Sequence, residues 1–133
     1  MIKKISEIPE KYIMFGIDIN GKEDKVIKIL KKNSNWKLLE NKKDLDHGDV
    51  LLNRYENKIL IGIALYNTTI QNEEIIIKTL LNILNTLTPT LESKEIAAIK
   101  TKKLFNDNIF GIKFEKIYEL FKNHKLRFKL YEL

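Results

Sequence analysis

The segment "IAAIKTKKLFNDNIFGIKFEKIYELF", residues 96–121, predicts a strand, a loop and a helix in that order. The apolar run at its start is typical of a buried strand. Many α/β proteins hold a phosphate with this arrangement, because the backbone N–H groups at the start of a helix favour an anion. The loop carries three lysines but only one glycine, whereas a close approach of the backbone to a phosphate favours glycine. The segment therefore indicates an α/β fold and leaves open whether its loop binds a phosphate or is a solvated connection.

The rest of the chain alternates strand-like and helix-like patterns. The run "YIMFGIDI", residues 12–19, is almost continuously apolar, which suits a strand that is buried on both faces. Residues 49–69 indicate a hairpin that turns near Glu56 and Asn57 and has a deeply buried second strand. Further strands are expected at 2–5, 95–100 and 125–133, and helices at 22–32, 73–87 and 113–122, the second of them stopped by Pro89. This order predicts a single domain over residues 1–133, a three-layer α/β/α fold with helices on both faces of a mixed, mostly buried central sheet.

Length and composition narrow the class of protein. The 133 residues suffice for one domain with its own core, and no apolar run approaches the ~20 residues that a membrane-spanning helix needs. The chain contains no cysteine, which excludes disulfides, thiolate metal sites and cysteine nucleophiles. His47 and His124 lie far apart in the sequence, so that a histidine-based metal cluster is not expected. We therefore expect a soluble intracellular protein of the cytoplasm or nucleus, with no membrane contact, no cofactor and no bound metal.

The formal net charge of +6 favours contact with nucleic acid, but the type of basic residue does not. Only Arg54 and Arg127 are arginines, and the arginine fork is the group that grips phosphates and base edges in fixed geometry. The chain is also rich in lysine, isoleucine and asparagine, a composition typical of AT-rich genomes, so much of the charge can lie on solvated faces. Non-specific binding of an RNA backbone by a diffuse lysine field stays open.

Three longer stretches resemble one known family. They are "GDVLLNRYENKILIGIALYNTT" at 48–69, "EIAAIKTKKLFNDNIFGIKFEKIYELF" at 95–121 and "RFKLYEL" at 127–133. In these patterns and in its element order, the chain resembles a small macrodomain, nearest the branch of the terminal ADP-ribose–protein glycohydrolases. The resemblance runs over nearly the whole chain, and it implies a macrodomain-like fold and a ligand such as ADP-ribose or a related nucleotide.

The ligand motifs of that family are mostly replaced in this sequence. No Gly-Asp pair follows the first strand, where only Ser6 and Glu7 are near, and a single Gly21 stands in place of a glycine-rich turn. The lysine that the glycohydrolase branch uses for its sugar intermediate would lie near Tyr66 and Asn67, and neither is a lysine. The resemblance therefore implies the scaffold of the family without inherited catalysis.

Candidate ligand-binding residues follow three of the predicted strands. Open α/β sheets place ligands at the carboxyl ends of their strands, so these three segments are expected to meet in one crevice. The candidates are Asp18, Asn20 and Gly21 after the first strand, Asn67 and Thr68 after the hairpin, and Lys100, Lys102, Lys103, Asn106, Asp107 and Asn108 in the loop. Asp18 is a natural acceptor for an adenine or a ribose, and the lysines supply positive charge to a phosphate.

Each group also has a structural explanation. Asn20 can cap the following helix, Thr68 can lie at a helix entry, and the Asn-Asp-Asn run of the loop is typical of a turn. The cluster "DLDHGD" at 44–49 offers oxygen ligands that suit a hard cation, but a solvated turn is the favoured interpretation. His124 is expected to interact with the carbonyl end of a helix.

Three functions are consistent with these residues. The first is a degenerate, non-catalytic macrodomain-like module, a pseudoenzyme that binds a nucleotide or offers an interaction surface to a protein. The second is an ADP-ribosyl hydrolase whose base is relocated to Asp18 or Asp107. The third is a basic structural subunit of a nucleoprotein assembly, which would use the lysine-rich helix at 22–32. Stabilisation by a nucleotide supports the first function, turnover of an ADP-ribosylated substrate the second, and salt-sensitive association with RNA the third.

Overall fold

The computed structural model describes residues 5–18, 28–30, 32, 46, 48–66, 73–101, 108–109 and 112–132. Its helical elements include the 3-10 helix η1 (Ile5–Glu7) and the α-helices α3 (Glu73–Leu91) and α4 (Phe114–Asn123). Its strands are β1 (Tyr12–Asp18), β2 (Val50–Tyr55), β3 (Lys58–Tyr66), β4 (Glu95–Ile99), β5 (Asn108–Ile109), β6 (Ile112–Lys113) and β7 (Arg127–Tyr131). Residues 28–30 and 32, from the predicted helix at 22–32, are helical, and the rest of that helix lies outside the described residues.

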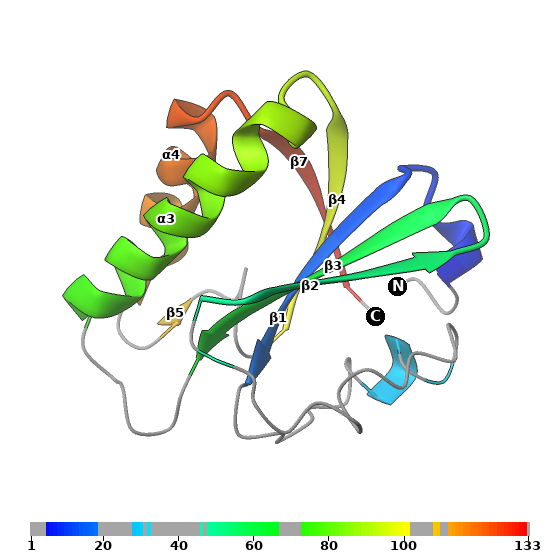
Figure 1. Cartoon of the computed structure of the whole chain (residues 1–133), viewed down its shortest axis with the longest axis horizontal. Helices are drawn as coiled ribbons and strands as arrows, with labels where there is room; N and C mark the ends of the chain where they lie inside the picture. Colours follow the sequence, from blue (N-terminus) through cyan, green and yellow to red (C-terminus); the bar gives the residue numbers. More distant parts are fainter. Residues whose placement is uncertain are drawn as a thin grey trace.

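The main sheet has five strands in the order β2-β3-β1-β4-β7 (Figure 1). β1 pairs in parallel with β3 and β4, β4 pairs in parallel with β7, and β2 runs antiparallel beside β3. The β2–β3 hairpin turns at Glu56, whose φ of 55° is the left-handed conformation that tight hairpin turns require. The mixed sheet and the position of the hairpin turn confirm the prediction from the sequence.

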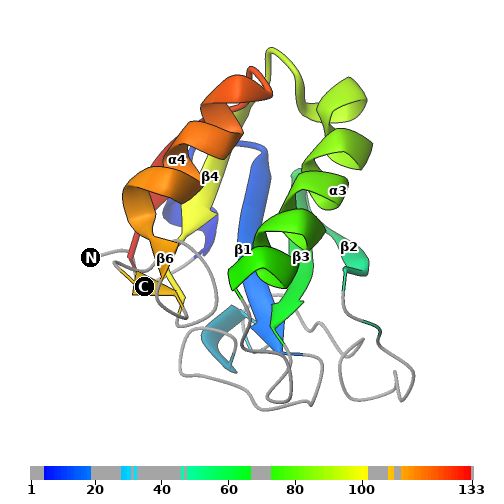
Figure 2. The same cartoon turned by 90° about the vertical axis from the view of Figure 1, so that its left-hand side faces the viewer.

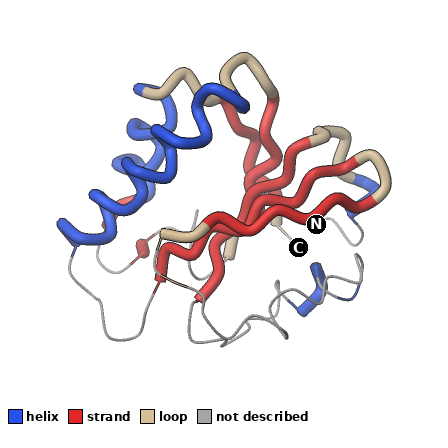
Figure 3. The backbone as a smooth tube through the Cα atoms, in the orientation of Figure 1, coloured by secondary structure: helices blue, strands red, loops and turns tan. Residues whose placement is uncertain are grey.

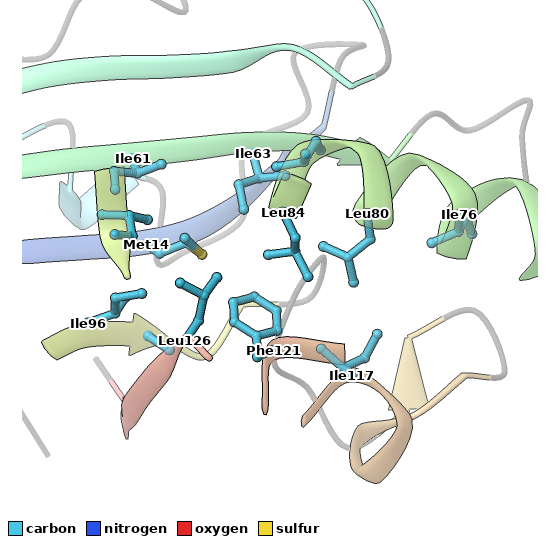
Figure 4. Close-up of a cluster of buried hydrophobic side chains, with 13 residues drawn as sticks. Met14, Ile61, Ile63, Ile76, Leu80, Leu84, Ile96, Ile117, Phe121 and Leu126 are labelled. Atoms are coloured by element: carbon cyan, nitrogen blue, oxygen red, sulfur yellow. The ribbon is translucent and has the colours of Figure 1, made fainter. Parts of the chain in front are cut away.

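Both faces of the sheet are covered. One cluster of buried side chains, here called the first cluster, lies between the sheet and the helices α3 and α4 (Figure 4). The second cluster lies on the opposite face and includes Ile5 of η1 and the helical residue Leu30. Along β1, Met14 belongs to the first cluster, whereas Phe15 belongs to the second. Since both side chains are fully buried, β1 is a strand buried on both faces, as its apolar run predicts.

Helices α3 and α4 lie side by side on the first face (Figure 2). Lys116 Nζ and Glu73 Oε1 form an ion pair between them at 3.0 Å, and His124 Nε2 lies 2.8 Å from Asn85 Oδ1. His124 Nδ1 lies 2.8 Å from the Leu120 carbonyl oxygen, which confirms its expected position at the C-terminal end of a helix. Figure 3 shows this helical layer on one side of the strands and the short helical segments on the other. Neither helix, nor any other in the described part of the chain, is long and apolar enough to cross a membrane.

Helix α3 runs past Pro89, so the expectation that this proline stops the helix was wrong. A proline removes one backbone donor from the helix, but Leu91 two residues later is buried in the first cluster. The Thr88 hydroxyl donates to the Leu84 carbonyl at 2.6 Å, and the Glu92 amide donates to the Thr88 carbonyl at 2.8 Å. The burial of Leu91 and these local hydrogen bonds offset the lost backbone bond.

Two further segments differ from the expectation. Ile5 begins η1 rather than ending a strand, because the turn brings Ile5 and Ile8 together into the second cluster. The rest of the predicted strand at 2–5 lies outside the described residues. Part of the predicted loop forms a small two-stranded sheet, in which Asn108 of β5 pairs with Lys113 of β6. This pairing leads the chain directly into α4.

Candidate ligand site at the carboxyl edge of the sheet

Four parallel strands end at one edge of the sheet, and candidate residues lie at these ends. Asp18, the last residue of β1, is paired with Tyr66, the last residue of β3, after a shift in the register between Ile17 and Asp18. On the other side of β1, Lys100 directly follows β4. The Lys100 amide donates to the carbonyl of Tyr131, the last residue of β7, at 2.9 Å. The structure therefore brings the backbones of Asp18, Tyr66 and Lys100 to the same edge.

The chain leaves these neighbouring strands toward opposite faces. After β1 it reaches the helical residues 28–30, of which Leu30 lies in the second cluster. After β3 and after β4 it reaches α3 and α4, which pack on the first cluster. Because β1 lies between β3 and β4, the direction of the connections reverses at β1. Open α/β sheets form their ligand crevice at the carboxyl ends of the strands beside such a reversal.

The candidate residues from the sequence fall into two groups. Asp18 and Lys100 lie at this edge, and Asn108 lies in β5, shortly before α4. The remaining candidates, Asn20, Gly21, Asn67, Thr68, Lys102, Lys103, Asn106 and Asp107, lie outside the described residues. Thr101 is not among the candidates from the sequence, yet it is only 3% exposed directly after Lys100. The sequence signal for a buried polar residue at this edge is a threonine that closely follows an apolar strand.

Asp46 and Asp49, from the acidic cluster at 44–49, form a turn. The Asp46 amide donates to Asp49 Oδ2 at 2.9 Å, and the Asp49 amide donates to the Asp46 carbonyl at 3.1 Å. One carboxylate oxygen of Asp49 therefore closes the turn that leads into β2. Asp44 and His47 lie outside the described residues, and the described residues contain no group of three acidic or histidine side chains that could hold a metal ion.

The segment that enters β1 is fastened by polar contacts at the end of β1 opposite Asp18. Lys58 is only 7% exposed, and its Nζ donates to the carbonyl oxygens of Ile8 and Glu10, the latter at 2.9 Å. The Tyr131 hydroxyl donates to both carboxylate oxygens of Glu10, at 2.8 and 2.9 Å. The pKa of Tyr131 is raised to about 12, mainly by burial and further by the hydrogen bond to Glu10 and by its negative charge. These contacts hold the entry segment in place.

A pocket of about 170 Å³ lies at the amino ends of β4 and β7, away from the candidate site. It is lined by Glu10, Glu95, Ile96, Arg127, Phe128 and Lys129. Two carboxylates and two cations share this small space and offset each other's charge. The pocket therefore has no charge preference that would select an anionic nucleotide.

The architecture is similar to that of solved structures with very different sequences. The X-ray structure of a protein from Bacteroides thetaiotaomicron matches 98% of this chain and 97% of that chain, with a TM-score of 0.64 at 11% identity. The macrodomain of Mycobacterium tuberculosis DarG matches 93% of this chain and 90% of that chain, with a TM-score of 0.64 at 9% identity. The alphavirus P23pro-zbd structure matches 96% of this chain and 20% of that chain, with a TM-score of 0.61 at 12% identity. The chain therefore has a macrodomain-like α/β fold.

The sequence matches no protein-family model and no curated protein. At identities of 9% to 12%, the likeness to solved structures establishes the fold alone. Since one fold supports many activities, the function has to be argued from the site.

Proposed function

We propose that the chain is a macrodomain-type module that binds ADP-ribose or a related nucleotide without turning it over. The observation that carries this proposal is that the connections reverse at β1. The carboxyl ends of β3 and β4 lie on either side of the carboxyl end of β1. The likeness to the macrodomain of DarG supports the same class of ligand.

The residues of this edge suit the parts of such a ligand. Asp18 would accept hydrogen bonds from the adenine amine or from ribose hydroxyls. Lys100, with Lys102 and Lys103 next in the sequence, would offset the charge of the diphosphate. The first-turn N–H groups of α4 would supply further donors, since the N-cap residue Lys113 makes no side-chain capping hydrogen bond.

The proposed module lacks the catalytic pattern of the glycohydrolase branch that the sequence resembles. Neither Tyr66 nor Asn67 offers an amine on which the sugar intermediate of that branch would form. Binding without bond cleavage is therefore the favoured function. Hydrolysis of an ADP-ribosyl group, with Asp18 or Asp107 as the base, is the alternative.

Ligand-dependent thermal stabilisation tests the proposed binding. The purified chain is heated with ADP-ribose, ADP, AMP, NAD or a short RNA. A ligand at ~100 times its dissociation constant adds about 2.7 kcal/mol to the free energy of unfolding, which raises the Tm by several degrees. We expect this shift with ADP-ribose, and we expect the Lys102→Glu/Lys103→Glu variant to lose it.

The matched control is the Lys94→Glu/Lys125→Glu variant. It makes the same change in net charge, but the two lysines precede β4 and β7 and so lie near the opposite edge of the sheet. This variant should keep the full shift with ADP-ribose. If no nucleotide raises the Tm of the unaltered chain, the proposal is wrong, and a salt-sensitive shift with RNA alone favours the nucleoprotein role.

Incubation with a mono-ADP-ribosylated protein separates binding from catalysis. We expect the modified substrate to stay intact in the presence of the chain, under conditions in which free ADP-ribose raises the Tm. Release of ADP-ribose by the unaltered chain, lost in Asp18→Asn or Asp107→Asn, would instead establish the hydrolase.

A further inference from the structure

The neighbouring strands β4 and β7 carry charged side chains on the face of the second cluster (Figure 1). Along β4, Ile96 belongs to the first cluster and Ala97 to the second, so Glu95 shares the face of Ala97. Glu95 is paired in register with Arg127 of β7, and paired residues of neighbouring strands lie on the same face. Lys129, two residues after Arg127, also lies on that face.

These three side chains line a pocket of about 170 Å³ together with Glu10, from the segment that enters β1. Both cations of the pocket come from β7, whereas its two carboxylates come from β4 and from the entry segment. Pockets for drug-sized ligands measure about 300–1,000 Å³, so this pocket suits a smaller molecule. Its charges favour a ligand that is neutral overall and carries one charge of each sign.

Tyr131 already engages one charge of each sign. Its hydroxyl donates to both carboxylate oxygens of Glu10, and Lys129 Nζ lies 5.5 Å from the centre of its ring. Glu95 and Arg127, in contrast, are exposed, and neither forms an ion pair within the described part of the chain. The Glu95 carboxylate and the Arg127 guanidinium are therefore the groups that a ligand of this pocket would meet.

We propose that this pocket binds a small zwitterion, namely a free amino acid with an uncharged side chain. The Arg127 guanidinium donates two parallel hydrogen bonds to the carboxylate of the ligand, which is the geometry that an arginine fork favours. The Glu95 carboxylate accepts hydrogen bonds from the ammonium group of the ligand. A ligand with a single charge would leave one of these two groups without a partner, so the pocket selects the zwitterion.

An NMR titration of the isotope-labelled chain with three related probes tests this site. At neutral pH, L-alanine carries both charges, propionate carries the carboxylate alone, and ethylamine carries the ammonium group alone. We expect millimolar L-alanine to shift the amide signals of Ile96 and Phe128, which line the pocket. Propionate and ethylamine should bind roughly 10-fold more weakly or worse, because each lacks the hydrogen bonds of one charged group.

Reversing one charge of the pocket gives the sharpest readout, because it should change which probe binds best. Glu95→Lys should weaken L-alanine binding roughly 10-fold or more and make propionate the preferred probe. Arg127→Glu should weaken L-alanine binding similarly and make ethylamine the preferred probe. The matched controls are Glu119→Lys on α4 and Lys78→Glu on α3, which make the same changes in net charge at exposed positions of the helices on the other face. Both controls should bind the three probes as the unaltered chain does.

Each other outcome overturns the site. If neither L-alanine nor the larger L-leucine shifts the pocket signals, the pocket binds no amino acid. If propionate or ethylamine binds the unaltered chain as tightly as L-alanine does, the pocket does not select a zwitterion. If Glu95→Lys and Arg127→Glu leave the affinity for L-alanine unchanged, the amino acid binds elsewhere.

Circular dichroism and the Tm of each variant show whether it is folded, and if Arg127→Glu fails to fold, the response to Glu95→Lys decides. The result is independent of nucleotide binding, since the pocket lies at the amino ends of β4 and β7 and the proposed nucleotide site at the carboxyl ends of the strands. The folded charge variants should therefore keep the Tm shift with ADP-ribose.

Discussion

At its amino end β1 is entered by a segment that polar side chains fasten to the sheet, whereas at its carboxyl end it stops beside two other parallel strands. The entry segment is held by the buried Lys58, which bonds to two of its carbonyls, and by the Tyr131 hydroxyl, which bonds to Glu10. The exit, at Asp18, is the point at which the connections reverse between the faces of the sheet. Polar residues at the entry thus serve stability, while we expect those at the exit to serve binding. Substitutions at the two ends of β1 test this difference.

The largest effect is expected from Lys58→Met. Methionine keeps the length and the apolar stem of the side chain but leaves the carbonyls of Ile8 and Glu10 without their buried donor. Since an unsatisfied buried polar group costs about 1–3 kcal/mol, we expect the free energy of unfolding to fall by roughly 2–3 kcal/mol. Urea denaturation at neutral pH measures this change.

Lys94→Met is the matched control for that substitution. Lys94 precedes β4 and is exposed, so the same loss of charge there should change the free energy of unfolding by less than about 0.5 kcal/mol. If the two substitutions have equal effects, the entry to β1 is not fastened by the Lys58 ammonium group.

A smaller effect is expected from Tyr131→Phe, which removes the hydroxyl that bonds to Glu10. Tyr131 is partly exposed, so solvent weakens this contact, and we expect a loss of about 1 kcal/mol at neutral pH. Urea denaturation of the unaltered chain and the variant at the same pH gives the difference.

The pH dependence of the same pair gives an independent check. The pKa of Tyr131 is raised from 10.0 to about 12 in the folded chain, so the folded state holds this proton more tightly than the unfolded state. The resulting stabilisation is fully present below pH 10 and is lost as the pH rises through about 12. Other groups titrate alike in the unaltered chain and in the Tyr131→Phe variant. The difference in unfolding free energy between these two proteins should therefore shrink over this pH range. A difference that stays constant would mean that the Tyr131 hydroxyl is not the group that titrates.

The two ends of β1 also differ in how well their polar residues could be recognised from the sequence. Asp18 and Lys100 could be chosen because each ends or follows an apolar run, and a parallel sheet brings such ends together. Lys58 could not be chosen, because it looks like an ordinary polar residue of a hairpin, and its partner Ile8 lies 50 positions away. The prediction that Pro89 ends the helix was wrong for the same reason, because the burial of Leu91 depends on the whole first cluster. Local patterns thus predicted the strands and the edge, and long-range packing decided the rest.

The smallest effect on stability is expected from Asp18→Asn at the exit. The substitution keeps the shape of the side chain and removes its charge, so the free energy of unfolding should change by no more than about 0.5 kcal/mol. The affinity for ADP-ribose should fall roughly 10-fold or more, because a hydrogen bond to a charged acceptor becomes one to a neutral amide. Isothermal titration calorimetry measures the affinity, and Glu95→Gln, which removes a charge at the opposite edge, is the control that should bind normally. If Asp18→Asn destabilises the chain as much as Lys58→Met and leaves the affinity unchanged, then Asp18 is structural, and both ends of β1 serve the fold.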